Sequence, residues 1–130
     1  MSKIIIDMKI LVQVAHWISY GYLIYAFGYA SLFKVFQKKS MMENMSNFGF
    51  GKIWTLFIGY GEVLGVIGLI VGFWMHQVKN ISTLWLLPFA IGALMVHFAH
   101  NDYKYFYTAL YCCIAGIILL VTDKNFKVIL

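Results

Sequence analysis

IWTLFIGYGEVLGVIGLIVGFWM, residues Ile53–Met75, decides the fold. At about 1.5 Å per residue, a helix of this length crosses the roughly 30 Å of a bilayer interior. Its only charged residue is Glu62. The twelve Leu, Ile, Val and Phe residues of the stretch favour insertion by about 5 kcal/mol, and one central acid opposes it by about 3 kcal/mol. The stretch therefore predicts a membrane-spanning helix that carries a buried carboxyl group.

Three further apolar runs accompany this one, joined by short polar segments. We expect helices at residues 10–35, 53–76, 81–99 and 103–122, with Pro88 breaking the third run and a tight polar loop at residues 76–80. The longest connector, residues 36–52, is expected to lie along the membrane interface. Short links favour antiparallel neighbours. The prediction is an all-α protein with one domain, residues 1–130, folded as an antiparallel four-helix transmembrane bundle.

Composition supports a multi-pass protein of the cell membrane, which we expect to be a bacterial inner membrane. The chain of 130 residues is 62% hydrophobic and 12% charged, about half the charged share of soluble domains. The net charge of +5 comes entirely from lysines at the ends of the apolar runs, which suits anchoring at lipid headgroups and not nucleic-acid binding. The lysines divide five to five between the two expected sides, so they leave the orientation open.

Helical spacing predicts which faces turn inward. Gly61, Gly65, Gly68 and Gly72 form a stripe of small residues that lets another helix approach closely, either within the bundle or in a homodimer. Glu62 lies beside this stripe, so we expect it to face the interior. The expected inward face of the first helix carries His16, Tyr20, Leu23, Phe27, Ala30 and Lys34. At one membrane side, above Glu62, we expect Lys34 to meet residues from the end of the third helix: His97, His100 and Asp102.

These residues predict a polar funnel that narrows to Glu62. Its candidate ligand-binding residues are Glu62, Lys34, His97, Tyr20, His100 and Phe27, and aromatic walls are expected from Tyr20, Tyr25, Phe27, Tyr107 and Tyr111. An ionisable group at this depth favours a ligand or proton site over a hydrogen bond between helices. Glu62 is expected to be ionised if Lys34 or His97 reaches it. Lys34 fits equally an interfacial anchor and a partner of Glu62.

We expect no metal site and no catalytic residue. His97 and His100 are spaced to share an ion, but zinc would need further ligands, for which only Asp102 and Glu62 are available. Cys112 and Cys113 are adjacent on a helix and cannot close an ordinary disulfide.

The sequence resembles the DoxX-like family of small four-helix membrane proteins. The first helix ends in Ser31-Leu32-Phe33-Lys34, the second carries Gly59-x-x-Glu62-x-x-Gly65, and the third ends with His97 before a polar break. Some family members are membrane subunits of thiosulfate–quinone oxidoreductase, others associate with redox enzymes, and animal relatives assist the assembly of receptor channels. The chain departs from redox members in having no cysteine pair on a loop.

The preferred hypothesis is a bundle without catalytic activity that binds a lipophilic small molecule, such as a quinone or lipid, or a partner membrane protein around Glu62. No cofactor beyond such a quinone or lipid is expected. One alternative is a membrane subunit of a quinone-linked sulfur or thiol oxidoreductase, with Glu62 and His97 relaying protons. Another is an assembly chaperone for membrane proteins, with the connector as its contact surface.

Overall fold

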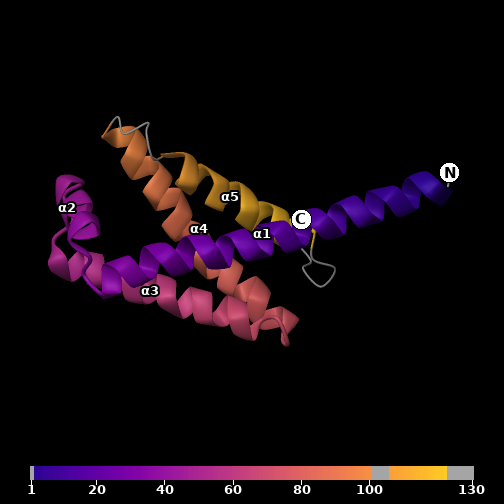
Figure 1. Ribbon diagram of the computed structural model, residues 1–130, viewed down its shortest axis with the longest axis horizontal. Helices are drawn as coiled ribbons and strands as arrows, with labels where there is room; N and C mark the ends of the chain where they lie inside the picture. The colour runs from indigo at the N-terminus through magenta and orange to yellow at the C-terminus, as the bar shows by residue number, and fades with distance from the viewer. Residues whose placement is uncertain (1, 101–105, 123–130) are drawn as a thin grey trace.

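Helices joined by short turns make up residues 2–100 and 106–122, which are the residues that this computed structural model describes. The helices are α1 (Ser2–Val35), α2 (Lys39–Asn47), α3 (Lys52–Val71), α4 (His76–Ala99) and α5 (Phe106–Val121) (Figure 1). The four longer helices close a ring in which α1 and α4 both pack on α3 and on α5. The predicted all-α class is confirmed.

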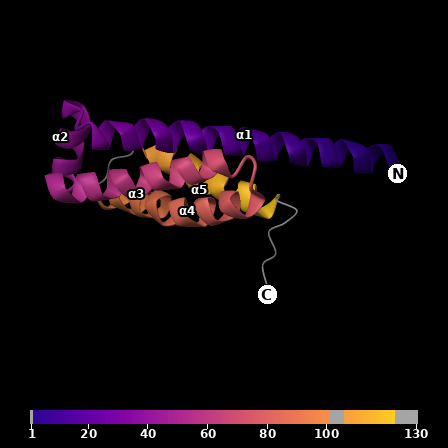
Figure 2. The same ribbon diagram turned by 90° about the horizontal axis from the view of Figure 1, so that it is seen from below.

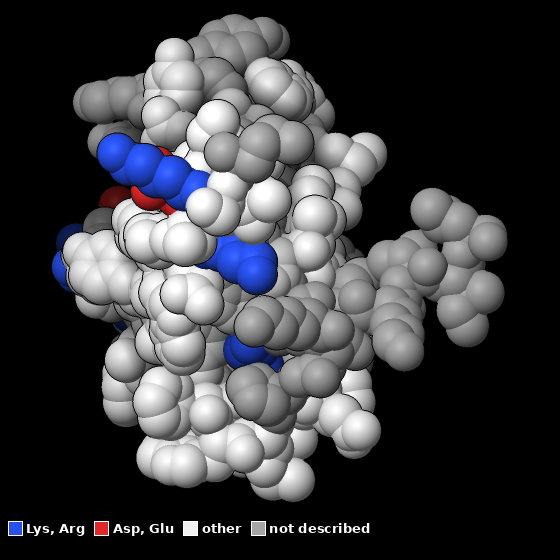
Figure 3. Space-filling view, turned by 90° about the vertical axis from the view of Figure 1, so that its right-hand side faces the viewer, with Lys and Arg blue, Asp and Glu red and all other residues white. Residues whose placement is uncertain are grey.

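The outer surface of the ring is apolar and its interior holds charge, which is the arrangement of a membrane protein. On α3, the side chains of Trp54, Phe57 and Leu64 are more than 60% exposed, whereas Glu62 is only 4% exposed. Figure 3 shows few charged side chains on the end of the molecule from which α1 projects. The helices α1, α3 and α4 are long and apolar enough to cross a membrane. The described part of α5 has 16 residues, so a fourth span stays a prediction.

Three predictions about the helices were wrong. α1 begins at Ser2 and not near residue 10, because its mixed polar start contains no Pro or Gly to end the helix. The expected loop at residues 76–80 is the start of α4, where Lys79 and Asn80 are buried against neighbouring helices. Pro88 lies inside α4 without ending it, as membrane helices tolerate. The connector contains α2, and the expected start of the last helix at 103 lies outside the described residues.

The length of α1 sets it apart from its neighbours. Its 34 residues span about 51 Å, against about 30 Å for the 20 residues of α3. In both ribbon views its N-terminal part runs past the ends of the other helices (Figures 1 and 2). Residues 2–14 of α1 are all exposed, and burial starts at Ala15 and His16. Only the second half of α1 therefore packs against the other helices.

The glycine stripe of α3 faces α4 within the same chain. A Cβ atom added at Gly61 would lie 2.8 Å from the Phe89 ring, and one at Gly65 would lie 2.4 Å from the Leu86 side chain. Further along, a Cβ at Gly72 would lie 2.5 Å from the backbone Cα of Lys79. The stripe thus serves the close approach of α3 and α4 inside the bundle, while a homodimer remains a prediction.

Two residues with positive φ bracket α2. Gln37 has φ of 56° and Gly49 has φ of 91°, and a Cβ added at Gly49 would meet nothing within 4 Å. We expect Gly49→Ala to cost about 1 kcal/mol of stability, because the strain lies in the backbone alone. Gly21→Ala is the control, since an added Cβ at Gly21 also meets open space but Gly21 has no positive φ. Chemical unfolding in detergent micelles measures both, and equal losses would contradict the explanation.

Candidate functional site

A buried ion pair joins α1 to α3. The Nζ atom of Lys34 donates a hydrogen bond to Oε1 of Glu62 over 2.7 Å. The two side chains are only 10% and 5% exposed. Charged pairs at this burial are costly to desolvate and persist only with close geometry, which this contact has. Of the two roles predicted for Lys34, partner of the carboxylate and interfacial anchor, the structure shows the first.

Gly59 explains how Lys34 reaches so deep from the last turn of α1. A Cβ atom at Gly59 would lie 2.7 Å from the Cβ of Lys34, so the backbone of α3 and the lysine are in direct contact there. The Lys34 side chain then extends along α3 from the level of Gly59 to Glu62, which is about one helical turn further. The spacing Gly59-x-x-Glu62 therefore places a groove for the lysine stem next to the carboxylate that binds its head.

A cavity of about 440 Å³ opens beside the ion pair, at the end of the bundle that α2 covers. We call it the α2-end cavity. Its walls come from all five helices, and small residues of α1, α4 and α5 leave the space: Ala26, Ala30, Ala90, Gly92, Ala93 and Ala109. Toward the other end of the bundle, fully buried leucines fill the interior: Leu23, Leu69, Leu86 and Leu119. The change from alanine to leucine positions determines where the bundle is hollow.

Helix α2 contributes to the cavity, and the sequence analysis did not predict this. Met41, Asn44, Met45 and Phe48 line the cavity, and Met45 is buried. Their spacing of i, i+3, i+4 and i+7 is that of one helical face, and this signal was present in the connector. The Phe48 ring packs edge-on against His97 and His100 of α4, with ring centres 5.2 Å apart in both cases. α2 thus lies across one end of the bundle and covers the cavity there (Figures 1 and 2).

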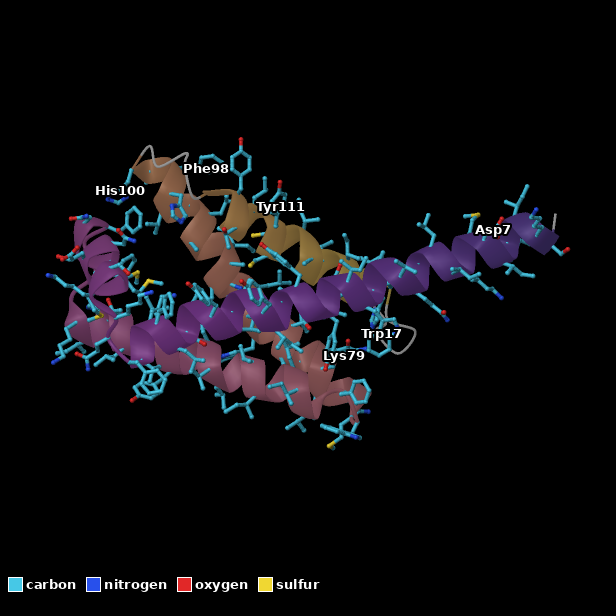
Figure 4. All side chains as sticks on the ribbon, in the orientation of Figure 1. Asp7, Trp17, Lys79, Phe98, His100 and Tyr111 are labelled. Atoms are coloured by element: carbon cyan, nitrogen blue, oxygen red, sulfur yellow. The ribbon has the colours of Figure 1, made fainter. Side chains whose placement is uncertain are left out.

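The structure brings together four of the six predicted site residues. Glu62, Lys34, Phe27 and His97 all line the α2-end cavity. His100 is exposed beside it and its Nδ1 atom lies 3.0 Å from the carbonyl oxygen of Val96 (Figure 4). Tyr20 lies nearer the opposite end of the bundle, where its hydroxyl donates to the carbonyl of Leu69.

Four of the five predicted aromatic walls were wrong, and Tyr20 is one of them. The side chains of Tyr25, Tyr107 and Tyr111 are exposed on the outside of the bundle, and Figure 4 shows Tyr111 pointing away from it. Spacing along one helix does not distinguish an inward aromatic face from one that meets lipid headgroups, where tyrosine is also favoured. The remaining predicted neighbour, Asp102, lies outside the described residues.

A second buried polar cluster lies at the opposite end, around Lys79 (Figure 4). The Lys79 ammonium is 3.1 Å from Nε2 of His16, and Nδ1 of His16 is 2.7 Å from the Thr122 hydroxyl. Because an ammonium only donates, Nε2 accepts and the ring proton is assigned to Nδ1, which donates to Thr122. The Thr122 hydroxyl in turn donates to the carbonyl of Ile118. The cluster connects α1, α4 and the end of α5.

The ion pair gives the cavity both hydrogen-bond donors and an acceptor. Lys34 uses one of its three N–H groups on Oε1. Within the described residues, no hydrogen bond reaches the second carboxylate oxygen, Oε2, and Glu62 faces the cavity. His97 and Cys112 also line this space, but in the part of the chain that the structure describes no three His, Cys, Asp or Glu side chains gather as metal ligands.

Comparison with known proteins identifies the family. No curated protein and no solved structure matched the chain. The family model described as the DoxX-like family matches residues 18–119, which include both partners of the ion pair and the whole cavity lining. The chain is therefore a membrane protein that belongs to the DoxX-like family.

Proposed function

We propose that this DoxX-like membrane protein binds a lipophilic small molecule in the α2-end cavity and has no catalytic activity of its own. The observation that carries the proposal is a buried ion pair, Lys34 with Glu62, exposed on one side to an apolar space of about 440 Å³. Cavities of this size, lined by apolar side chains with a few polar groups, are typical of small-molecule sites. If the pair served stability alone, well-packed apolar residues at both positions would keep the protein as stable as the pair does.

The residues that line the site support an apolar ligand with one polar end. Aromatic and small apolar residues form most of the lining, among them Phe27, Phe89 and Ala93. The cavity lies under α2, whose polar residues Lys39, Glu43 and Asn47 are exposed on the face away from it. A ligand bound there places its apolar part among the helices and its polar end at the ion pair.

Filling the cavity tests the proposal. Gly92 lines the cavity, and a Cβ atom added there meets nothing within 4 Å, so Gly92→Phe projects a ring into open space. We expect the wild-type protein, released from its native membrane into native mass spectrometry, to retain one lipophilic molecule that Gly92→Phe loses. Gly21→Phe is the matched control, because Gly21 is an exposed helical glycine with equally open surroundings outside the cavity.

The comparison remains informative if Gly92→Phe folds poorly. Ala30→Phe then fills the same cavity from α1, and Ala15→Phe is its half-buried control on the same helix. Equal retention of the molecule by a folded cavity-filling variant and its control would contradict the proposed site. A wild-type protein that retains no molecule, and gains none with 1-decanol, would contradict the function.

One observation favours a second candidate, a membrane subunit of a quinone-linked oxidoreductase. Glu62 and His97 line the same cavity, and both can exchange the protons that quinone reduction consumes. Repeated co-purification with a coloured redox partner would favour this candidate over the first.

Other interactions stay predictions. Lipid surrounds the apolar exterior of the bundle, and a bacterial inner membrane is the proposed location. Docking of a partner membrane protein, a role as an assembly chaperone and a homodimer are each compatible with the exposed apolar faces of the helices.

A further inference from the structure

The ion pair that lines the α2-end cavity carries two opposite charges, which cancel. Lys34 and Glu62 meet at 2.7 Å, so the pair as a whole is neutral. The other polar side chains of the lining are Asn44, Thr108, Cys112 and His97, and the amide, hydroxyl and thiol among them are uncharged. A ligand with a net charge would add an unbalanced charge to a space of low polarity, which is strongly unfavourable.

The same pair presents complementary hydrogen-bonding groups. The Glu62 carboxylate has an oxygen, Oε2, that accepts no hydrogen bond from the described residues, and the Lys34 ammonium has N–H groups beyond the one used on Oε1. A ligand hydroxyl can donate to the first and accept from the second at once. An ether or ester can only accept, so it leaves the carboxylate oxygen unsatisfied in an apolar site.

From these two features we propose that the cavity selects uncharged amphiphiles whose polar end both donates and accepts a hydrogen bond, as an alcohol does. Permanently anionic amphiphiles are rejected by Glu62, and permanently cationic ones by Lys34. This inference rests on the proposed function, since it names the chemical class that the α2-end cavity takes.

A series of ten-carbon probes tests the selection while the apolar chain stays constant. The probes are 1-decanol, decyl methyl ether, decyl sulfate and decyltrimethylammonium, each added at a low mole fraction to the full chain in phosphatidylcholine nanodiscs. Binding is read from the shift in the thermal unfolding midpoint and from adducts in native mass spectrometry. We expect the alcohol to bind at least about tenfold more tightly than the ether, which loses one hydrogen bond to a charged group. Both charged probes should bind more weakly than the alcohol by at least the same factor.

The ion pair itself provides the control. In the double variant Lys34→Met/Glu62→Leu both charges are replaced by apolar side chains, so the tenfold preference for the alcohol over the ether should disappear while binding of the ether persists. Gly92→Phe should weaken all probes alike, because it fills the cavity without touching the pair.

The outcomes separate the two proposals. If no probe binds the wild-type protein better than Gly92→Phe, the proposed function fails. If the probes bind in the cavity but the sulfate, the ammonium or the ether matches the alcohol, the function stands and the ligand class is overturned. Persistence of the alcohol preference in the double variant would also overturn the class, since the pair would then not be its source.

Discussion

Lys34→Met is expected to destabilise the protein by about 3–5 kcal/mol. The substitution keeps the apolar stem that packs on Gly59 and removes the charge, which leaves the Glu62 carboxylate buried without its partner. A buried charge without a partner costs far more free energy than a buried ion pair does. The free energy of unfolding, measured by titration with sodium dodecyl sulfate in mixed micelles and followed by circular dichroism, reports the loss.

Two variants make this test specific. Lys39→Met changes an exposed lysine on α2 and should alter the stability by less than about 0.5 kcal/mol. The double variant Lys34→Met/Glu62→Leu should regain most of the lost stability, because two apolar side chains replace the two charges together. A double variant no more stable than Lys34→Met would show that the pair is not the source of the effect.

Gly72→Ala is expected to cost about 3 kcal/mol, the second large effect. The added methyl group would lie 2.5 Å from the Cα and 2.6 Å from the backbone nitrogen of Lys79, and backbone atoms cannot rotate away as a side chain end can. Overpacking of this kind typically costs about 1–3 kcal/mol, and here it acts where α3 and α4 are joined by a short turn. The same unfolding titration measures it.

The control for Gly72→Ala is Gly21→Ala. Gly21 lies inside α1 and an added Cβ there meets nothing within 4 Å, so alanine should be neutral or stabilise the helix by up to about 1 kcal/mol. A Gly72→Ala protein as stable as the control would mean that α3 and α4 do not approach as closely as the structure shows.

Much of the bundle could be predicted because polar residues in an apolar chain have few places to lie. Glu62 had to turn inward, and Lys34, at the same end of the bundle, was one of two cations that could reach it. The glycine stripe beside Glu62 indicated a close helix neighbour, and α4 is that neighbour. Each of these inferences depends on the large cost of placing a polar group, or leaving a gap, against lipid.

The two wrong helix starts, those of α1 and α4, share a different cause, since both concern polar segments near the ends of the apolar runs. Such residues suit a loop or a helix end equally in sequence, and only the partner decides between them. Lys79 belongs to α4 because His16, 63 positions earlier, lies opposite it. The position of α2 over the cavity depends likewise on the space that alanines of three other helices leave beside it. Pairings between residues so far apart are not visible in one sequence.

The polar contacts of α1 have a consequence for biogenesis. Among the described helices α1 is synthesised first, and it carries polar partners for three of the later ones: Lys34 and Tyr20 for α3, and His16 for both Lys79 of α4 and Thr122 after α5. Each of these segments can therefore place a buried polar group against α1 as it enters the membrane. A chain synthesised without residues 2–35 would lose all of these contacts, so we expect it to insert less completely.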